Sequence, residues 1–398
     1  MISLPDYEQY KRTFAHTARP FAYVNLDLLD ENIRQIAAAA GDKTIRVASK
    51  SIRSVPVMSR IFAASDVFKG VMCYSAREAL FLLQHGFDDL LLGYPVYNAT
   101  EIYELLMASK DLYTVTFMVD SMDHLHLLAK QAKKAAVVAN ICLDIDMSTS
   151  YPGLHFGVHR SPLTSWAQTE PLVQEILHNH YIHLDGIMGY EAQIAGLGDN
   201  VASQKMKSAV IRFLKTRSVQ TVARRRSEIL TGLNQLGVNL RFVNAGGTGS
   251  LASSRLEAGV TEITAGSGFF SPTLFDHYRG FQYFPAAGYA IEVVRKPSAH
   301  MVTCLGGGYT ASGVAGPDKA PSIHLPQGIK MIGTEGAGEV QTPLKVPAGL
   351  QLNIGDPIFL RHAKAGELCE RFTKLYAISD GEIVDELVTY RGEGECFL

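Results

Sequence analysis

Residues 21 to about 270 repeat one pattern, in which a short apolar run rich in β-branched residues precedes a longer segment of helical periodicity. Such alternation is typical of parallel strands joined by crossover helices. The strand candidates are residues 21–26, 44–49, 67–73, 89–93, 114–119, 137–145, 183–189, 241–245 and 262–265. About 250 residues with eight or nine such units match the size of a (β/α)8 barrel.

The main alternative to a barrel is a doubly wound open sheet. That fold usually has a glycine-rich turn after its first strand, where this chain has Asp27-Leu28-Leu29-Asp30. We therefore predict an α/β protein with an N-terminal (β/α)8 barrel of the TIM type.

After residue 275 the pattern changes. Glycine and proline become frequent, helical periodicity disappears, and short alternating runs follow at residues 289–294, 300–305, 328–332, 356–361 and 373–378. This pattern indicates a compact antiparallel β domain. We predict a barrel at residues 20–275 and a β domain at 276–398, with residues 1–19 packed on the latter.

Bulk composition excludes several classes of protein. The 398 residues carry a net charge of −2, and no basic stripe is present, which argues against nucleic acid as a partner. None of the five cysteines forms a CxxC pair, so a disulfide framework and a structural zinc site are not expected. The N-terminus lacks the layout of a signal peptide, and no apolar stretch approaches the length of a membrane span. We expect a cytoplasmic protein.

A basic run, Arg224-Arg225-Arg226, lies inside the long connection between residues 192 and 236. Because the run falls within a helical pattern, we expect a solvated helix face or a subunit contact.

Lys50 follows the apolar strand at residues 44–49, near its carboxyl end. On the sequence alone, burial and the flanking Arg46 and Arg53 would favour the neutral amine, which attacks carbonyls and forms Schiff bases. A solvated loop lysine is the alternative at this position.

Two glycine-rich turns follow the last two strands of the predicted barrel. The first is Ala245-Gly246-Gly247-Thr248-Gly249-Ser250, and the second is Ala265-Gly266-Ser267-Gly268. In barrels the turns after strands seven and eight commonly bind phosphate, through backbone N–H groups and hydroxyls. A phosphate site opposite a Schiff-base lysine implies pyridoxal 5'-phosphate.

These features together resemble the fold-type III pyridoxal-phosphate enzymes, the alanine racemase-like group, and most closely its D-threonine aldolase and D-serine dehydratase branch. The resemblance rests on residues 19–27, on the Arg46-to-Lys50 spacing, on residues 186–191 and on both glycine turns. It covers nearly the whole chain. It implies a homodimer that acts on a small amino acid, with no role for a membrane.

The resemblance also implies roles for individual residues. Lys50 would hold the cofactor as an internal aldimine and act as a general base or acid, and Tyr190 would stack on the pyridine ring. The phosphate would lie against Gly247, Thr248, Gly266 and Ser267. The other residues assigned to the cofactor are Arg46 and Thr264, and Thr264 falls where alanine racemases carry an arginine that faces the pyridine nitrogen.

The β domain departs from the pattern of its branch. Relatives bind a divalent metal through a histidine followed two residues later by cysteine or aspartate, whereas this chain has His362-Ala363-Lys364. A protonated lysine does not coordinate a metal, although its charge could replace one. His362 is therefore the only plausible metal ligand, and we do not expect a bound metal. His362 and Lys364 could instead polarise or deprotonate a substrate hydroxyl.

Three further candidates lie elsewhere. Tyr309 could serve a racemase as the acid or base opposite Lys50, or simply pack between the domains. His155, His159 and Arg160, in a loop after the strand at 137–145, could bind a carboxylate.

The sequence thus predicts a pyridoxal-phosphate-dependent lyase for a small D-amino acid with a β-hydroxyl, acting by retro-aldol cleavage or dehydration. The alternatives are an amino-acid racemase, a non-catalytic carrier of the cofactor, and a sugar-phosphate barrel enzyme without it. The β domain argues against the carrier, because single-domain relatives of that kind lack one.

Overall fold

A computed structural model describes residues 4–314 and 316–397, and it contains a closed eight-stranded parallel barrel. The strands follow one another around the barrel in the order β10-β11-β2-β3-β4-β5-β6-β9. Their bounds are Thr44–Ala48 for β2, Phe68–Cys73 for β3, Leu90–Leu92 for β4, Val115–Val119 for β5, Ala139–Asp144 for β6, Ile182–Gly189 for β9, Phe242–Ala245 for β10 and Glu262–Ala265 for β11. The predicted TIM-type barrel is confirmed.

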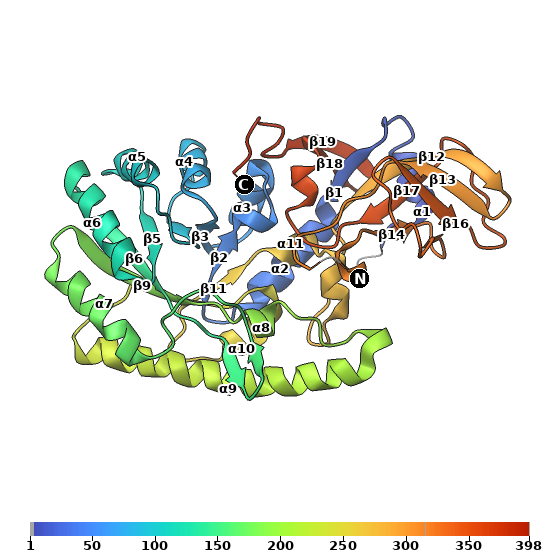
Figure 1. Ribbon diagram of the computed structural model, residues 1–398. Coiled ribbons are helices and arrows are strands. Elements are labelled where there is room, and N and C mark those ends of the chain that lie inside the picture. Colours follow the sequence, from blue (N-terminus) through green and yellow to red (C-terminus); the bar gives the residue numbers. More distant parts are fainter. Residues whose placement is uncertain (1–3, 315, 398) are drawn as a thin grey trace.

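Helices surround the barrel on its outside (Figure 1). Their bounds are Leu26–Ala39 for α2, Val55–Ala64 for α3, Ala76–Gln84 for α4, Ala99–Ser109 for α5, Met122–Ala135 for α6, Trp166–His178 for α7, Ala192–Ala195 for α8, Lys205–Gln235 for α9, Leu251–Ser254 for α10 and Ser267–Phe270 for α11. No helix among the described residues is both long and apolar enough to cross a membrane.

The second domain is a mainly antiparallel sheet beside the barrel (Figure 1). Its strands are Phe21–Asn25 (β1), Ala287–Ser298 (β12), Met301–Leu305 (β13), Ser322–Leu325 (β14), Lys330–Met331 (β15), Gln341–Lys345 (β16), Pro357–Arg361 (β17), Lys374–Ser379 (β18) and Glu382–Val388 (β19). Each of the five runs expected after residue 275 contains a strand, although the run at 328–332 contributes only the two residues of β15. The N-terminal helix α1 (Tyr7–Thr13) packs on this sheet, where Tyr10 and Phe14 contact Tyr23 and Phe359.

The first expected strand forms, but not in the barrel. β1 pairs antiparallel with β12 and parallel with β18, so it is part of the second sheet. Its five residues are all buried. A mainly apolar run of this kind looks the same in a barrel strand, so the sequence does not reveal which strands it pairs with. Because α2 begins at Leu26, directly after β1, the chain passes from the sheet into the barrel without a linker.

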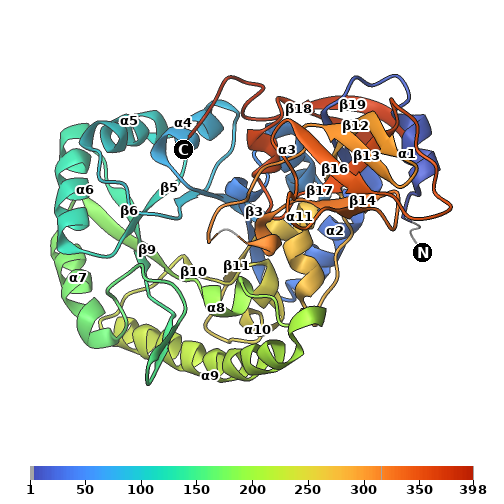
Figure 2. The ribbon, with the colours of Figure 1, turned by 45° about the vertical axis from the view of Figure 1, so that its right-hand side comes forward.

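Helix α9 is 31 residues long and curves along one side of the barrel (Figure 2). The basic run lies within it, and only Arg224 is exposed. Arg225 donates to the carbonyls of Asp146 and Ser148, and Arg226 is 1% exposed and contacts two glutamates. The expectation of a solvated helix face was therefore wrong for two of the three arginines, because carboxylates and carbonyls of the barrel face this side of the helix.

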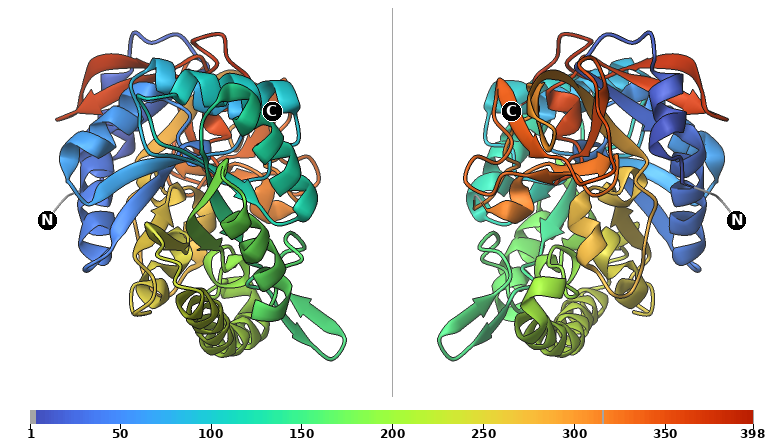
Figure 3. Two further views of the ribbon diagram at one scale, coloured as in Figure 1. Left: turned by 90° about the vertical axis from the view of Figure 1, so that its left-hand side faces the viewer. Right: turned by 90° about the vertical axis from the view of Figure 1, so that its right-hand side faces the viewer.

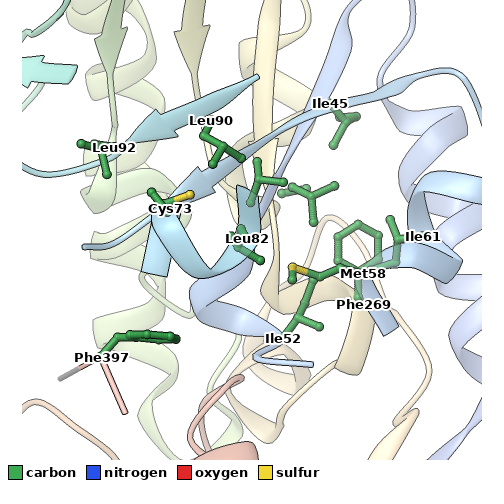
Figure 4. Close-up of a cluster of buried hydrophobic side chains, with 14 of the residues drawn as sticks. Ile45, Ile52, Met58, Ile61, Cys73, Leu82, Leu90, Leu92, Phe269 and Phe397 are labelled. Carbon is green, nitrogen blue, oxygen red and sulfur yellow. The ribbon is translucent and has the colours of Figure 1, made fainter. Parts of the chain in front are cut away.

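A short hairpin, β7 (Thr149–Tyr151) with β8 (Leu154–Phe156), projects from the barrel after β6 (Figure 3). Elsewhere in the barrel, a cluster of buried hydrophobic side chains fixes the turn that follows β2. Ile52 points into that cluster beside Met58 and Phe269 (Figure 4). The backbone two residues after Lys50 is thus anchored in the core.

Candidate active site

Lys50 lies in a short turn, Ser49–Ser51 (η1), at the carboxyl end of β2. The turn is held from below, because the Ser49 hydroxyl donates to the Met72 carbonyl at 3.0 Å and Ile52 is fully buried. The Lys50 ammonium donates a hydrogen bond to the Tyr94 hydroxyl at 3.0 Å. A fixed backbone therefore carries a reactive group at the end of the barrel where active sites of this architecture lie.

A cavity of about 540 Å³ opens around Lys50. This volume is typical of small-molecule sites, which span roughly 300–1,000 Å³. Barrel and β domain both contribute to its wall, which includes Lys50, Ser51, Tyr94, Arg160, Tyr190, Asn244, Gly247, Thr248, Thr264, Gly266, Ser267, Ser312, Lys364 and Glu367. Nine residues predicted from the sequence share this wall: Lys50, Arg160, Tyr190, Gly247, Thr248, Thr264, Gly266, Ser267 and Lys364.

The two glycine turns meet on one side of the cavity. Thr248 Oγ1 accepts hydrogen bonds from the backbone N–H groups of Gly266 (3.4 Å) and Gly268 (3.1 Å), which ties the turns together. The hydroxyls of Ser51 and Ser267 lie 3.2 Å apart. A Cβ at position 266 would come within 2.9 Å of both Ser51 and Ala48, so only glycine fits there. The turns present hydroxyls and a bare backbone, a set of donors suited to phosphate oxygens.

Glu191 holds the first glycine turn from behind and was not predicted. This buried carboxylate accepts from the Gly246 N–H at 3.1 Å and from the Ser254 hydroxyl, and Arg226 lies 3.5 Å away. Gly246 has a φ of +79°, a conformation that glycine adopts without steric cost and other residues do not. The sequence signal was present, since a charged residue directly after a buried strand needs a partner in the fold.

Two tyrosines and Arg160 form another side of the cavity. The Arg160 guanidinium lies 5.6 Å from the centre of the Tyr94 ring and 5.5 Å from that of Tyr190. Burial raises the pKa of the Tyr190 hydroxyl to about 12. Burial acts in the same direction on Tyr94, but the Lys50 and Arg160 cations outweigh it and bring the pKa of Tyr94 below its ordinary value.

Thr264 lies within the cavity wall and is held by Asn244. The two side chains share hydrogen bonds of 2.9 and 3.1 Å, and Asn244 also donates to Glu262 at 2.7 Å. The residue that faces the cavity here is therefore a fixed, uncharged hydroxyl.

Arg46 does not reach the cavity. Its side chain is fully buried inside the barrel, with two hydrogen bonds to Glu262 (2.7 and 2.8 Å) and contacts to Asp89. The alternation of side chains along β2 explains this placement, because Arg46 points inward below the end of the strand that carries Lys50. The assignment of Arg46 to the cofactor is not supported by this position.

Burial and the flanking arginines, which the sequence suggested as reasons for a neutral Lys50, are not supported by the structure. Arg46 is neutralised by Glu262 and Asp89, and Arg53 lies 2.6 Å from Glu370. The Lys50 side chain itself is exposed in the open cavity. Its position at the end of β2, rather than burial or neighbouring positive charge, is what distinguishes this lysine.

His362 is fully buried and does not line the cavity. Its ring meets the edge of Phe270, and among the described residues neither imidazole nitrogen has a hydrogen-bond partner. Burial, with a smaller effect of Arg361, lowers the pKa of His362 to about 3. His362 therefore does not face a substrate in this structure, because the strand β17 that precedes it turns its side chain into the core.

Tyr309 is also absent from the cavity wall. Its ring lies beside Tyr289, with the Arg371 guanidinium 5.2 Å from the ring centre, and burial raises the pKa of its hydroxyl. Within this chain it packs in the β domain, so it does not face Lys50.

Lys364 enters the cavity from the β domain. Its ammonium donates to the Ser312 carbonyl at 2.8 Å, and burial lowers the pKa of Lys364. The loop that carries Lys364 directly contacts the turn that carries Lys50. A Cβ at Gly366 would fall 1.9 Å from the Lys50 carbonyl oxygen.

Of the three carboxylate-binding candidates predicted after β6, one lines the cavity and two do not. Arg160 lines the cavity, whereas His155 and His159 stack on each other with ring centres 3.9 Å apart and are absent from its wall. In the described part of the chain, no three histidine, cysteine or acidic residues are grouped as a metal site would need. Tyr94 was missed because it lies in no motif, although Gly93-Tyr94 follows an apolar strand as Lys50 does.

Comparisons with known proteins agree with this architecture. Residues 24–270 match the family model described as "Alanine racemase, N-terminal domain". No curated protein matches the sequence significantly.

Several solved structures share the fold across both domains. D-threonine aldolase from Filomicrobium marinum superposes with a TM-score of 0.80 at 15% identity, over 95% of each chain. D-threo-3-hydroxyaspartate dehydratase from Delftia sp. HT23 gives 0.71 at 17% identity, over 95% of this chain and 98% of that one. An alanine racemase of Clostridium difficile 630 gives 0.63 at 15% identity, over 93% and 98%. At such identities these likenesses show the fold alone.

Proposed function

Because the chain belongs to the alanine racemase N-terminal domain family, whose enzymes depend on pyridoxal phosphate, we propose that it is a pyridoxal-phosphate-dependent lyase. Its substrate would be a small D-amino acid with a β-hydroxyl. The observation that carries the proposal is that one cavity joins Lys50, the two glycine turns and a cation of the β domain, Lys364.

The cavity fits the cofactor in three respects. The glycine turns offer backbone and hydroxyl donors to a phosphate, at a point where a Cβ would fill the space. The ring of Tyr190 lies beside Gly247 and provides a flat wall for an aromatic ring. Lys50 lies on the same wall as a point of covalent attachment.

When bound, pyridoxal phosphate supplies an electron sink that stabilises negative charge at the α-carbon of an amino acid. The residues of the chain would then bind the substrate and move protons. Lys50 takes or returns a proton on its side of the substrate, and Tyr94, hydrogen-bonded to it at 3.0 Å, exchanges that proton. Arg160 pairs with the α-carboxylate, and the uncharged Thr264 faces the cofactor ring.

Lys364 would act at the β-carbon. Its ammonium can hydrogen-bond the β-hydroxyl oxygen and offset negative charge that develops there. In a retro-aldol cleavage the hydroxyl proton would pass to solvent in the open cavity as the Cα–Cβ bond breaks, which releases an aldehyde, and Lys50 would return a proton to the α-carbon. In a dehydration the Cα–H and Cβ–O bonds break, and water leaves.

The racemase alternative gains no support from the arrangement of acids and bases. Tyr94 accepts a hydrogen bond from Lys50 and so lies on the same side of the cavity, and Tyr309 is not part of the cavity wall. A lyase needs no opposed pair. The resemblance also implies a homodimer, which light scattering of the purified protein tests, and the composition of the chain leads us to propose a cytoplasmic location.

The test combines a spectrum with product analysis. Protein purified with pyridoxal phosphate should absorb in the visible range of the lysine-bound cofactor, and Lys50→Ala should lose that band completely. A matched control, Lys374→Ala, removes an exposed lysine and should keep it. D-threonine and D-serine are then offered, followed by chiral analysis: glycine or ammonia supports a lyase. L-amino acid alone would replace the lyase by a racemase, and a colourless protein would overturn the whole proposal.

A further inference from the structure

Three cations of the cavity have no carboxylate partner. Lys50 donates to Tyr94, Arg160 lies over two tyrosine rings, and Lys364 donates to Ser312. No carboxylate among the described residues lies within 4 Å of any of them. The fourth cation of the wall, Arg53, is paired with Glu370 at 2.6 Å.

The one acidic side chain of the wall is already engaged. Both oxygens of Glu367 accept the backbone N–H of Ser312, at 3.0 and 3.2 Å. Glu367 thus fixes the loop that positions Lys364, and its charge acts on Lys364 through space without an ion pair within 4 Å. Lys319 lies close by, since it and Lys364 are the nearest neighbours of Gly313, but Lys319 pairs with Asp318.

The charges of an amino-acid substrate account for only part of this set. Lys50 is used for covalent attachment, and the phosphate is met by hydroxyls and backbone N–H groups. The α-carboxylate needs one cation, and Arg160, held between Tyr94 and Tyr190, supplies it. Lys364 remains, on the β-domain side of the cavity, as a partly exposed ammonium with no ion-pair partner within 4 Å among the described residues. Such a cation in the wall of a cavity can pair with an anionic group of the ligand.

We propose that Lys364 and Ser312 form a subsite for a second carboxylate, so that the preferred substrate is a β-hydroxy dicarboxylic amino acid. This inference rests on the proposed function, because it places the substrate in the same cavity. The lysine ammonium has three donors, of which one goes to the Ser312 carbonyl at 2.8 Å and another makes a longer bond of 3.4 Å to the Ser312 hydroxyl. The third donor, with the proton of the Ser312 hydroxyl, is available for a ligand that carries a carboxylate and a hydroxyl on the same β-carbon.

A matched pair of substrates tests the subsite in the holoenzyme. D-threonine and D-threo-3-hydroxyaspartate both carry a β-hydroxyl and differ in a methyl against a carboxylate. In the wild type, kcat/KM should be higher for the dicarboxylic substrate by about 10- to 100-fold, the usual contribution of a hydrogen-bonded charge. Lys364→Met should lower kcat/KM for both substrates, because Lys364 also acts at the β-hydroxyl, and should lower it by a further factor of about 10 to 100 for the dicarboxylic substrate, so that the preference disappears. The control Lys374→Met should leave both values unchanged. If Lys364→Met lowered both equally, or if D-threonine were preferred, the subsite would be refuted.

Binding without turnover separates this inference from the proposed function. Calorimetry of D-aspartate and D-alanine with the holoenzyme compares a side-chain carboxylate with none. D-aspartate should bind about tenfold more tightly, and Lys364→Met should abolish the difference. Lysine-dependent binding of D-aspartate with no lyase product would retain the subsite and overturn the lyase. Cleavage of D-threonine with no preference for D-aspartate would do the reverse.

Discussion

Arg46 and Lys50 lie four residues apart, and the two cations have opposite surroundings. Arg46 is fully buried between Glu262 and Asp89, and Arg241, an exposed arginine that shares Asp89, is likewise paired with Asp185 and Asp89. Lys50 faces a cavity in which it, Arg160 and Lys364 have no carboxylate partner among the described residues. Charges that hold the barrel together are neutralised within the chain, whereas charges of the cavity are left for a ligand.

The largest loss of stability is expected from a substitution in the barrel interior. Arg46→Met leaves the buried Glu262 without its cation, and the free energy of unfolding should fall by about 3–5 kcal/mol. Urea unfolding measures the change. The double variant Arg46→Met/Glu262→Met should recover most of the loss, and Lys374→Met, which breaks an exposed pair, should cost less than about 1 kcal/mol. A loss below about 1 kcal/mol for Arg46→Met would remove the distinction between the two regions.

Tyr94 is expected to matter for turnover rather than stability. Tyr94→Phe removes the hydroxyl that accepts from Lys50, so kcat should fall by about 10- to 100-fold while the visible absorbance of the cofactor stays. Because the pKa of Tyr94 is lowered, an alkaline decline of kcat that begins below pH 10 in the wild type should be absent from the variant. Tyr97→Phe, at an exposed tyrosine, serves as the control. Unchanged kcat would limit Tyr94 to a packing role.

His362 belongs to neither group, since it is buried without charge or partner. Its pKa of about 3 in the folded protein lies below the ordinary value of 6.5, so protons bind preferentially to the unfolded chain. Stability should therefore fall as the pH drops from about 6.5 towards 3, by about 2 kcal/mol between pH 7 and pH 5. His362→Leu should lose this part of the pH dependence, as measured by urea unfolding at both values. An identical loss in variant and wild type would show that His362 is not held neutral.

The smallest effect is expected from metal removal. If Lys364 supplies the positive charge at the β-carbon, dialysis against EDTA should leave kcat/KM within about twofold of its starting value. Addition of Mn²⁺ or Zn²⁺ after dialysis is the matching control. Activity that disappears with EDTA and returns with metal would mean that Lys364 does not replace one.

Much of the fold could be predicted from the sequence because each barrel strand is an apolar run that is followed by a segment of helical periodicity. β1 shows the limit of that signal. Its run is as apolar as a barrel strand, but pairing partners depend on contacts across more than 260 residues, such as Phe21 with Ala290. Periodicity carries no information about such partners.

The sequence predicts those cavity residues whose place depends on the position of the backbone. It does not predict those whose place depends on the direction of the side chain. Lys50 and both glycine turns follow strands, so parallel strands bring them to one end of the barrel. His362 lies two residues from Lys364, but only the latter reaches the cavity, because the strand end turns one side chain inward and the loop turns the other out. Tyr94 and Glu191 carry no motif, and their roles arise from tertiary contacts alone.

The contact between Gly366 and the Lys50 carbonyl has a consequence for how the two domains could be exchanged. The loop that carries Lys364 is fitted against the turn of Lys50 so closely that no side chain is tolerated between them. A chimera that joined this barrel to the β domain of a relative would therefore need glycine at this point, whatever residues it brought for specificity. The two halves of the cavity form a matched set, and new specificities are best sought by changing side chains within this β domain.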